Sequence, residues 1–233
     1  MLGQHKVHDK SNEITAIPAL LEHLNLQGVI VTIDAMGTQS KIAEAIRAKG
    51  VDYILALTGD QSDLQADVVR FFEDKALAET CFMHQTTNAG HGRVEERFIR
   101  AADASDWVTS MHPHWKDLRT IVAVTSARTQ KKSGQTSTET RYYITSLPPD
   151  PVQLLADIRS HWSIENTLHW SLDVTFGEDK SRLHTDNAAA NMAIIRKVAF
   201  NALKQNPSDL SLKLKRIKAA HDQAFRSALI NRS

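Results

Sequence analysis

Four ionisable side chains recur at intervals of four residues late in the chain: His161, Glu165, His169 and Asp173. Residues four apart share one face of an α-helix, so a carboxylate and two imidazoles could point into one site. Ile164, Leu168 and Leu172 form an apolar stripe beside them, which predicts an amphipathic helix over 161–173. This polar face is either simply solvated or part of a divalent-metal site. A metal site needs further carboxylates from elsewhere in the chain.

One such carboxylate ends the clearest predicted strand, GVIVTID at 28–34. Its β-branched run is typical of a strand buried on both faces. A helix over 42–48, ended by Gly50, and a strand over 52–57 follow, which predicts a parallel β-α-β unit. Ligands of open α/β sheets lie beyond the carboxyl ends of strands, where Asp34 stands. We expect Asp34 either to have a functional role or only to cap the following turn.

The flanking segments indicate an α/β protein with a β-rich section inside it. A short strand over 2–7 and a helix capped at Ser11 and Asn12, with Pro18 marking its start, precede the β-α-β unit. A helix over 63–77 follows it. From 80 to 147 the sequence alternates and is rich in β-formers, with a turn at 131–136, which predicts antiparallel strands. Arg93 and Arg97 lie on a charged edge there, either solvated or in contact with phosphates.

Helices are predicted beyond the proline-rich break at 148–151. The first begins at Val152 and leads into the His161 motif, and a second spans 187–205. The tail from 213 to 232 reads as a basic helix carrying Lys213, Lys215 and Arg216, which is either a solvated end or a nucleic-acid contact.

The overall composition restricts the classes of protein to which this chain can belong. A content of 42% hydrophobic and 24% charged residues fits an ordinary globular protein, and a net charge of +1 confines any nucleic-acid binding to local patches. Cys81 is the single cysteine, so no internal disulfide forms, and we expect a half-buried thiol in a reducing cytoplasm. The sequence contains no run long and apolar enough to cross a membrane and no signal peptide near its start.

Asp34 and Glu165 could together form half of a two-metal phosphoryl-transfer site. Such sites hold Mg²⁺ through a few carboxylates, and the two ions assist the nucleophile and the leaving oxygen. A zinc or manganese hydrolase built on His161, Glu165, His169 and Asp173 is an alternative, although its spacing is not that of zinc proteases. A second alternative is a DNA-binding remnant without catalysis.

The sequence resembles the Asp-Asp-Glu (DDE) transposases of bacterial insertion sequences, in the H-repeat-associated branch. The resemblance rests on segments in the family's order along nearly the whole chain: LGQHKVHDKSNEITAIPALL (2–21), VTIDAMGTQ (31–39), DYILALTGDQ (52–61), HGRVEER (91–97), RYYITSL (141–147) and HWSIENTLHWSLDVTFGEDKSR (161–182). It implies DNA transposition by metal-dependent strand cleavage and transfer. Asp34 and Glu165 would be the second and third triad carboxylates, holding Mg²⁺ or Mn²⁺.

The resemblance also implies an organisation and partners. A ribonuclease-H-like core would occupy 1–79, a β-rich insertion 80–147, and a helical part completing the core 148–233. The DNA partner would be the double-stranded ends of an insertion sequence, and such proteins usually work as homo-oligomers.

This sequence departs from the family pattern in two places, which limits the functional residues that the resemblance can assign to it. Relatives supply the first triad aspartate from a strand upstream of the region that aligns with Leu2, so we expect two of three carboxylates, two core strands missing, and little or no strand transfer. Relatives also surround the glutamate with a Tyr-Arg-Glu-Lys signature. Here His161 precedes Glu165 by four residues and no lysine follows seven residues later, so the contacts of that signature are not carried over.

Overall fold

A computed structural model describes residues 13–90, 92–183, 185 and 187–231. The chain forms two compact units, one ending at His161 and the other beginning at Trp162. The strand predicted over 2–7 and the cap at Ser11 and Asn12 lie outside the described residues. Helix α1 (Glu13–His23) contains Pro18 in its interior, so the prediction that Pro18 starts the helix was wrong.

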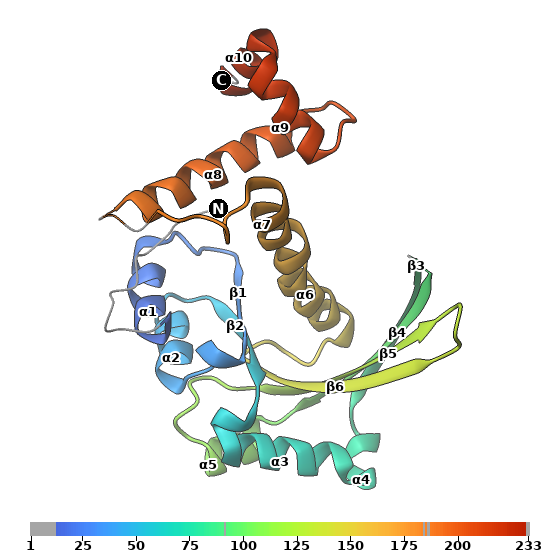
Figure 1. The fold of residues 1–233 in the computed structure, drawn as a ribbon. Helices are drawn as coiled ribbons and strands as arrows, with labels where there is room; N and C mark the ends of the chain where they lie inside the picture. The colour runs from blue at the N-terminus through green and yellow to red at the C-terminus, as the bar shows by residue number, and fades with distance from the viewer. Residues whose placement is uncertain (1–12, 91, 184, 186, 232–233) are drawn as a thin grey trace. The chain divides into compact units, whose positions relative to one another are not determined.

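The first unit is built on a six-stranded sheet with the order β1-β2-β6-β5-β4-β3 (Figure 1). The strands span Ile30–Ile33 (β1), Asp52–Leu57 (β2), Phe82–Gly90 (β3), Arg93–Asp103 (β4), Thr120–Gln130 (β5) and Thr136–Thr145 (β6). β1 and β2 are parallel, and every other neighbouring pair is antiparallel. The predicted mixture of a parallel unit and antiparallel strands is confirmed. The β-rich section joins the same sheet through the pairing of β2 with β6.

The predicted β-α-β unit is present. β1 leads through a 3₁₀ turn, η1 (Ala35–Gly37), to α2 (Ser40–Ala48) and back to β2. Gly50 ends α2 with φ of +71°, a left-handed conformation that glycine adopts without steric cost. β1 is shorter than predicted and only half-buried, because it is an edge strand of the described sheet. The expectation of a strand buried on both faces was therefore wrong.

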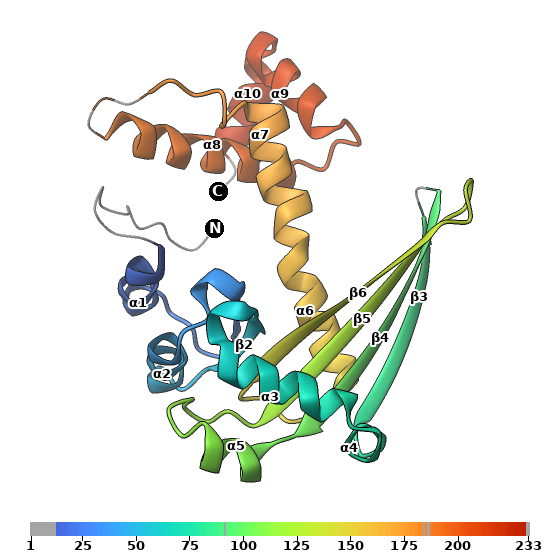
Figure 2. The same cartoon turned by 60° about the horizontal axis from the view of Figure 1, so that its bottom comes forward.

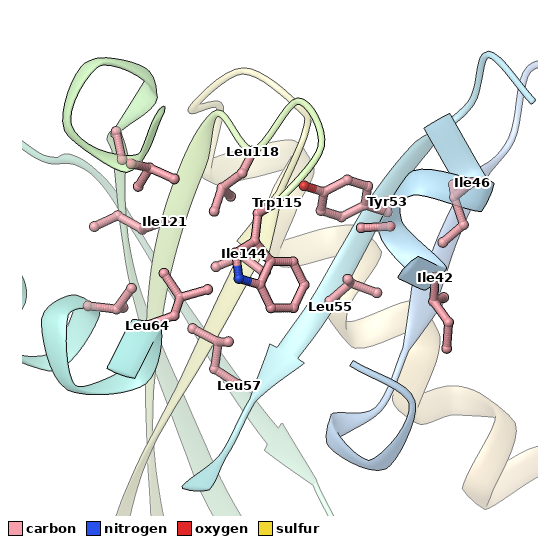
Figure 3. Packing of buried hydrophobic residues seen from close by; sticks show 14 of the residues in the cluster. Ile42, Ile46, Tyr53, Leu55, Leu57, Leu64, Trp115, Leu118, Ile121 and Ile144 are labelled. Atoms are coloured by element: carbon pink, nitrogen blue, oxygen red, sulfur yellow. The ribbon is translucent and has the colours of Figure 1, made fainter. Parts of the chain in front are cut away.

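One face of the sheet is covered by α2, α3 (Ser62–Glu73) and α5 (Ser105–Met111) (Figure 2). Figure 3 shows aliphatic side chains of β2 and α2 packed around Tyr53 and Trp115 in this core. The helix predicted over 63–77 is instead two helices. Asp74 separates α3 from α4 (Lys75–Glu79), because its carboxylate accepts hydrogen bonds from the first backbone amides of α4. Helix α5 was not predicted. Cys81 is buried, more fully than the half-buried thiol that we expected, and burial raises the pKa of its thiol.

The other face of the sheet is covered by α6 (Pro151–Ile164), which begins directly after the predicted break. Pro151 occupies its first position, where a missing N–H is tolerated. Leu154, Leu155 and Ile158 pack against the strands. The sheet is thus sandwiched between helices, and its longest strands extend away from α6 (Figures 1 and 2).

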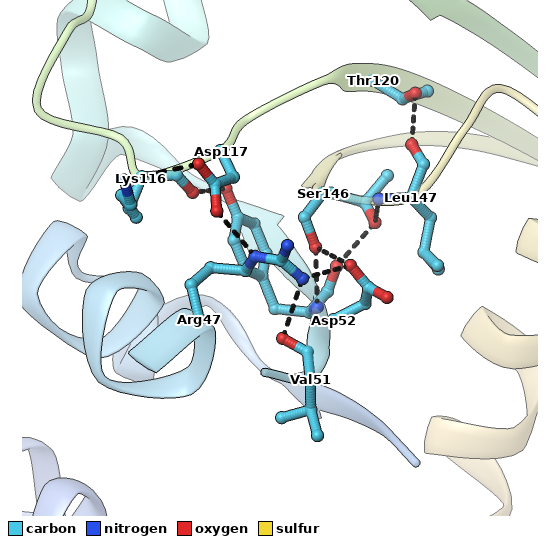
Figure 4. Close-up of polar contacts among 10 residues, drawn as sticks. Arg47, Val51, Asp52, Lys116, Asp117, Thr120, Ser146 and Leu147 are labelled. Carbon is cyan, nitrogen blue, oxygen red and sulfur yellow. Dashed lines mark hydrogen bonds and ion pairs between the residues drawn. The ribbon is translucent and has the colours of Figure 1, made fainter. Parts of the chain in front are cut away.

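Polar contacts fasten the β-rich strands to the parallel unit (Figure 4). The Ser146 hydroxyl donates to Asp52 Oδ1 at 2.8 Å and accepts from the Tyr53 N–H at 3.1 Å. Arg47 forms ion pairs with Asp52 and, at 2.9 Å, with Asp117. The Ser146 bonds join β2 to the end of β6 and thereby support the register between the two parts of the sheet, while Arg47 ties α2 to β2 and to the segment before β5.

The second unit is helical in its described part. A π-helical turn, η3 (Glu165–His169), follows α6 and leads into α7 (Trp170–Phe176) and α8 (Ala188–Gln205). α8 confirms the helix predicted over 187–205. The tail is two helices, α9 (Leu212–His221) and α10 (Gln223–Ile230), because Asp222 caps the second one. None of the helices in the described ranges has the length and apolar character needed to cross a membrane.

Candidate active site

Asp34 stands at the carboxyl end of β1, as predicted, with its side chain exposed to solvent. Its carboxylate accepts a long hydrogen bond from the backbone N–H of Gly37, at 3.4 Å, and thereby caps η1. The side chain therefore caps the turn and also remains open to solvent. A residue can cap a turn anywhere in a fold, whereas Asp34 stands at the carboxyl end of a strand, where α/β sheets bind their ligands. Its position therefore also suits a ligand-binding role.

The turn that carries Asp34 is fixed from several sides. Thr38 is fully buried, and its hydroxyl lies within hydrogen-bond distance of the backbone oxygens of Asp34, at 3.1 Å, and of Ala56 in β2, at 2.7 Å. The Gln61 amide donates to the backbone oxygen of Thr38 at 2.8 Å. These bonds hold the backbone of Asp34 against β2, so its carboxylate projects from a rigid support.

A contact that the sequence did not predict joins α6 to β1. Thr32 Oγ1 and His161 Nδ1 are 3.0 Å apart, within hydrogen-bond distance. Thr32 lies two residues before Asp34, and the backbone is extended at Asp34, so the two side chains leave the same face. The contact therefore fastens α6 to β1 close to Asp34. Nothing in the spacing of the two residues, 129 apart, signals it.

The regular four-residue stripe predicted from His161 to Asp173 is interrupted. The π-turn over Glu165–His169 closes i→i+5 hydrogen bonds and shifts the following residues around the helix. The prediction of one continuous α-helix over 161–173 was therefore wrong. The side chain of Glu165 lies outside what the structure describes. A π-turn inside a helix is frequent at functional sites.

No group of three or more His, Cys, Asp or Glu side chains able to hold a metal occurs among the described residues. The hydrolase alternative built on His161, Glu165, His169 and Asp173 therefore gains no support from the described members of that set, His161, His169 and Asp173.

The predicted DNA-contacting residues fall into two settings. Lys213 and Arg216 are exposed on α9. Lys215 is buried, and its ammonium donates to the backbone oxygen of Asn206 at 2.7 Å, so it is used within its own unit. Arg93 is exposed on β4, whereas Arg97 is largely covered.

Glu95 lies between these two arginines and binds both of them. Arg128 of β5 approaches the same carboxylate at 3.7 Å. Burial acts to raise the pKa of Glu95, but the guanidiniums of Arg97, Arg93 and Arg128 outweigh it and hold the pKa below its usual range. Glu95 therefore stays ionised at the centre of an arginine cluster.

A second feature missed by sequence reasoning is a pocket of about 490 Å³ on the α2–α3 side of the sheet. The starts of both helices and the segment after α5 line it. His112 Nε2 and Asp67 Oδ2 are 2.9 Å apart in its wall, and the His112 side chain is almost fully buried. The segment 111–115 has no periodicity, so its sequence gave no signal of this pairing.

The fold is that of a mixed α/β protein, with the exposed Asp34 carboxylate at the end of a parallel strand. The model of the family described as Transposase DDE domain matches residues 1–202. This match and the relatives described next place the chain in the DDE transposase domain family.

The H repeat-associated protein YhhI of Escherichia coli (strain K12), which carries the name of a transposase, is 36% identical over 236 residues. YncI of Escherichia coli O157:H7, also named as a transposase, is 39% identical over 211 residues. These alignments cover 99% and 88% of this chain. The chain spans 62% of the length of YhhI and 53% of that of YncI.

Proposed function

We propose that this chain carries part of the machinery for DNA transposition by metal-dependent phosphoryl transfer, with Asp34 and Glu165 as carboxylate ligands. The observation that carries the proposal is the exposed Asp34 carboxylate on a fixed turn at the end of β1. The substrate would be the double-stranded DNA at the ends of an insertion sequence. Since bacterial DNA lies in the cytoplasm, we propose that the protein acts there.

The sheet supports a ribonuclease-H-like core as part of this proposal. Helix α2 connects the parallel strands β1 and β2 and packs on one face of the sheet, and α6 packs on the other face. In this arrangement the carboxyl end of β1 is exposed, while the hydrophobic faces are covered. Catalysis by carboxylates requires such rigid support, because a small displacement of a metal ligand costs a large factor in rate.

The donor chemistry of Asp34 fits Mg²⁺ or Mn²⁺, which prefer oxygen ligands and keep several waters. The Gly37 N–H lies 3.4 Å from one carboxylate oxygen, a weak contact that a metal could displace. When bound, the metal would help to form the nucleophile and stabilise the leaving oxygen. Asp34 belongs to no group of three or more such side chains among the described residues, so Glu165, water and DNA phosphates would complete the set.

His161 and Thr32 have a positioning role in this proposal. Glu165 follows His161 by four residues, about one helical turn. The Thr32–His161 hydrogen bond ties the end of α6 in this unit to the strand that carries Asp34. This contact supports Thr32 and His161 as positioning residues for the strand that carries Asp34.

Calorimetric titration with Mn²⁺ tests the proposal, using wild type, Asp34→Asn and Glu165→Gln. Glu79→Gln, which removes one exposed carboxylate from α4, is the matched control. We expect binding by wild type and the control and its loss in both site variants. Unchanged binding in either site variant would remove that residue from the site. Mn²⁺ binding without any nicking of duplex DNA would instead support a DNA-binding protein without catalysis.

A further inference from the structure

The two faces of the outer β3–β6 sheet differ in chemistry. Register assigns each side chain to a face, because directly paired residues on neighbouring strands point the same way. Ile99 of β4 pairs with Val124 of β5, which pairs with Arg141 of β6, and both aliphatic residues pack in the core beneath α6. The face that continues this core outward therefore includes Arg141.

Stepping by two residues from Ile99 and Val124 extends the same face toward the hairpin ends. It collects four arginines, two glutamates and small polar residues. We call it the arginine face, and its charged members are Arg93, Glu95, Arg97, Arg128, Glu139 and Arg141. Four arginines against two glutamates leave a net charge of +2, although the whole chain has a net charge of only +1.

The opposite face has a different composition. Threonines of β5 and β6 pair across the strands there, with hydroxyl oxygens 2.9 Å apart for Thr125 and Thr140 and 2.8 Å apart for Thr129 and Thr136. Phe98 is partly exposed on this face, between Glu96 and Arg100 of β4, whose charges balance. The Arg100 guanidinium donates to the backbone oxygen of Phe72 in α3 at 2.9 Å. Basic charge is thus concentrated on one side of the outer sheet.

Ion pairs with the two glutamates hold the four arginines of this face. Glu95 Oε1 lies 2.8 Å from Arg93 Nε, and the same carboxylate binds Arg97 and approaches Arg128. Glu139 binds Arg141 with Nε and Oε1 2.8 Å apart. Arg97 is the covered member of the cluster, whereas the side chains of Arg93 (55%), Arg128 (53%) and Arg141 (43%) are substantially exposed. Arg97 therefore braces Glu95, and the other three arginines extend toward solvent.

We propose that the arginine face binds the phosphate backbone of duplex DNA through Arg93, Arg128 and Arg141, with Glu95 and Arg97 holding the cluster in place. Guanidinium groups match phosphate oxygens in geometry and charge, and backbone contacts of this kind position a duplex without reading its sequence. This inference rests on the proposed function, because it names a surface for the same DNA substrate.

Fluorescence anisotropy with a short duplex over a salt series, without divalent metal, tests this surface. The variant Arg128→Gln/Arg141→Gln removes two exposed arginines. The control Arg70→Gln/Lys75→Gln removes the same charge from α3 and α4, on the other side of the sheet. Each lost phosphate contact lowers the slope of log affinity against log salt by about 0.9. We expect a slope smaller by about 2 and an affinity about 10- to 60-fold weaker at 0.1 M salt for the first variant.

The control should retain the slope of wild type. Equal losses in both double variants, or no loss in Arg128→Gln/Arg141→Gln, would overturn the inference while leaving Mn²⁺ binding at Asp34 and the proposed function intact. Tighter binding of polyglutamate than of duplex would show that the arginine face takes acidic protein segments instead. A wild type that binds no duplex would overturn the arginine face and the proposed DNA substrate together.

Discussion

Substituting Gly37 by alanine tests how tightly the turn after β1 is packed. A Cβ at this position would lie 2.4 Å from Ile33 Cγ2 and 3.1 Å from Ile17 Cδ1. The first distance is far inside van der Waals contact. Ile33 cannot easily move its Cγ2, since that methyl is attached directly to Cβ and β-branched side chains are stiff at χ1. The turn carrying Asp34 must therefore shift.

The expected cost is that of overpacking a well-filled site, about 1–3 kcal/mol of unfolding free energy. For a protein of this size each kcal/mol corresponds to about 2–4 °C, so a cost of 2 kcal/mol lowers the melting temperature by about 4–8 °C. Gly37 does not have positive φ, so the cost arises from the clash and not from backbone strain.

Thermal melting of Gly37→Ala beside Gly59→Ala measures this effect. Gly59 follows β2 much as the Gly37 turn follows β1, yet a Cβ there meets nothing within 4 Å. Gly59→Ala should therefore melt close to wild type. Combining Gly37→Ala with Ile33→Leu, which moves the branch away from Cβ, should cost less than the two single changes added together. A Gly37→Ala protein as stable as Gly59→Ala would refute the reasoning.

Three further predictions concern polar groups in the first unit. Glu95→Gln should destabilise the protein by about 1–2 kcal/mol at neutral pH, because its arginine partners lose a carboxylate. Because the pKa of Glu95 is lowered in the folded protein, chemical denaturation should show this difference shrinking as the pH falls below 4.5 and through the folded pKa. Its neighbour Glu96→Gln should show no such difference. Tyr53→Phe should cost about 1 kcal/mol in the same assay, since it leaves a backbone oxygen without its 3.0 Å donor. A double-mutant cycle of Thr32→Val and His161→Ala should give a coupling energy of about 0.5–1.5 kcal/mol, and zero coupling would contradict the observed contact.

Local patterns predicted most of the elements correctly where a single physical rule dominates. β2 and α8 were located to within a residue, because an apolar run or a helical period leaves little choice. Gly50 marked the end of α2 for a similar reason, since a left-handed residue stops the helix. Two segments that were each predicted as one helix are each two helices in the structure. Asp74 and Asp222 cap the second helix of each pair, although the apolar pattern continues through them.

The chemical identity and approximate setting of Asp34 were also predictable. Its position after a β-branched run identified a strand end, and the structure places it there. The grouping of Arg93 and Arg97 with Glu95 could be suspected from their proximity in sequence. Which of them is exposed could not, because that depends on how β4 packs within the sheet.

The sequence by itself determined the β-α-β unit, the antiparallel strands after it and the acidic residue at the end of β1, since these follow from periodicity and turn chemistry between near neighbours. Only the tertiary structure decided the Thr32–His161 contact, the division of charge between the sheet faces and the order of the strands. Those features depend on strand register and on helix packing between residues far apart in the chain, which local sequence patterns do not encode.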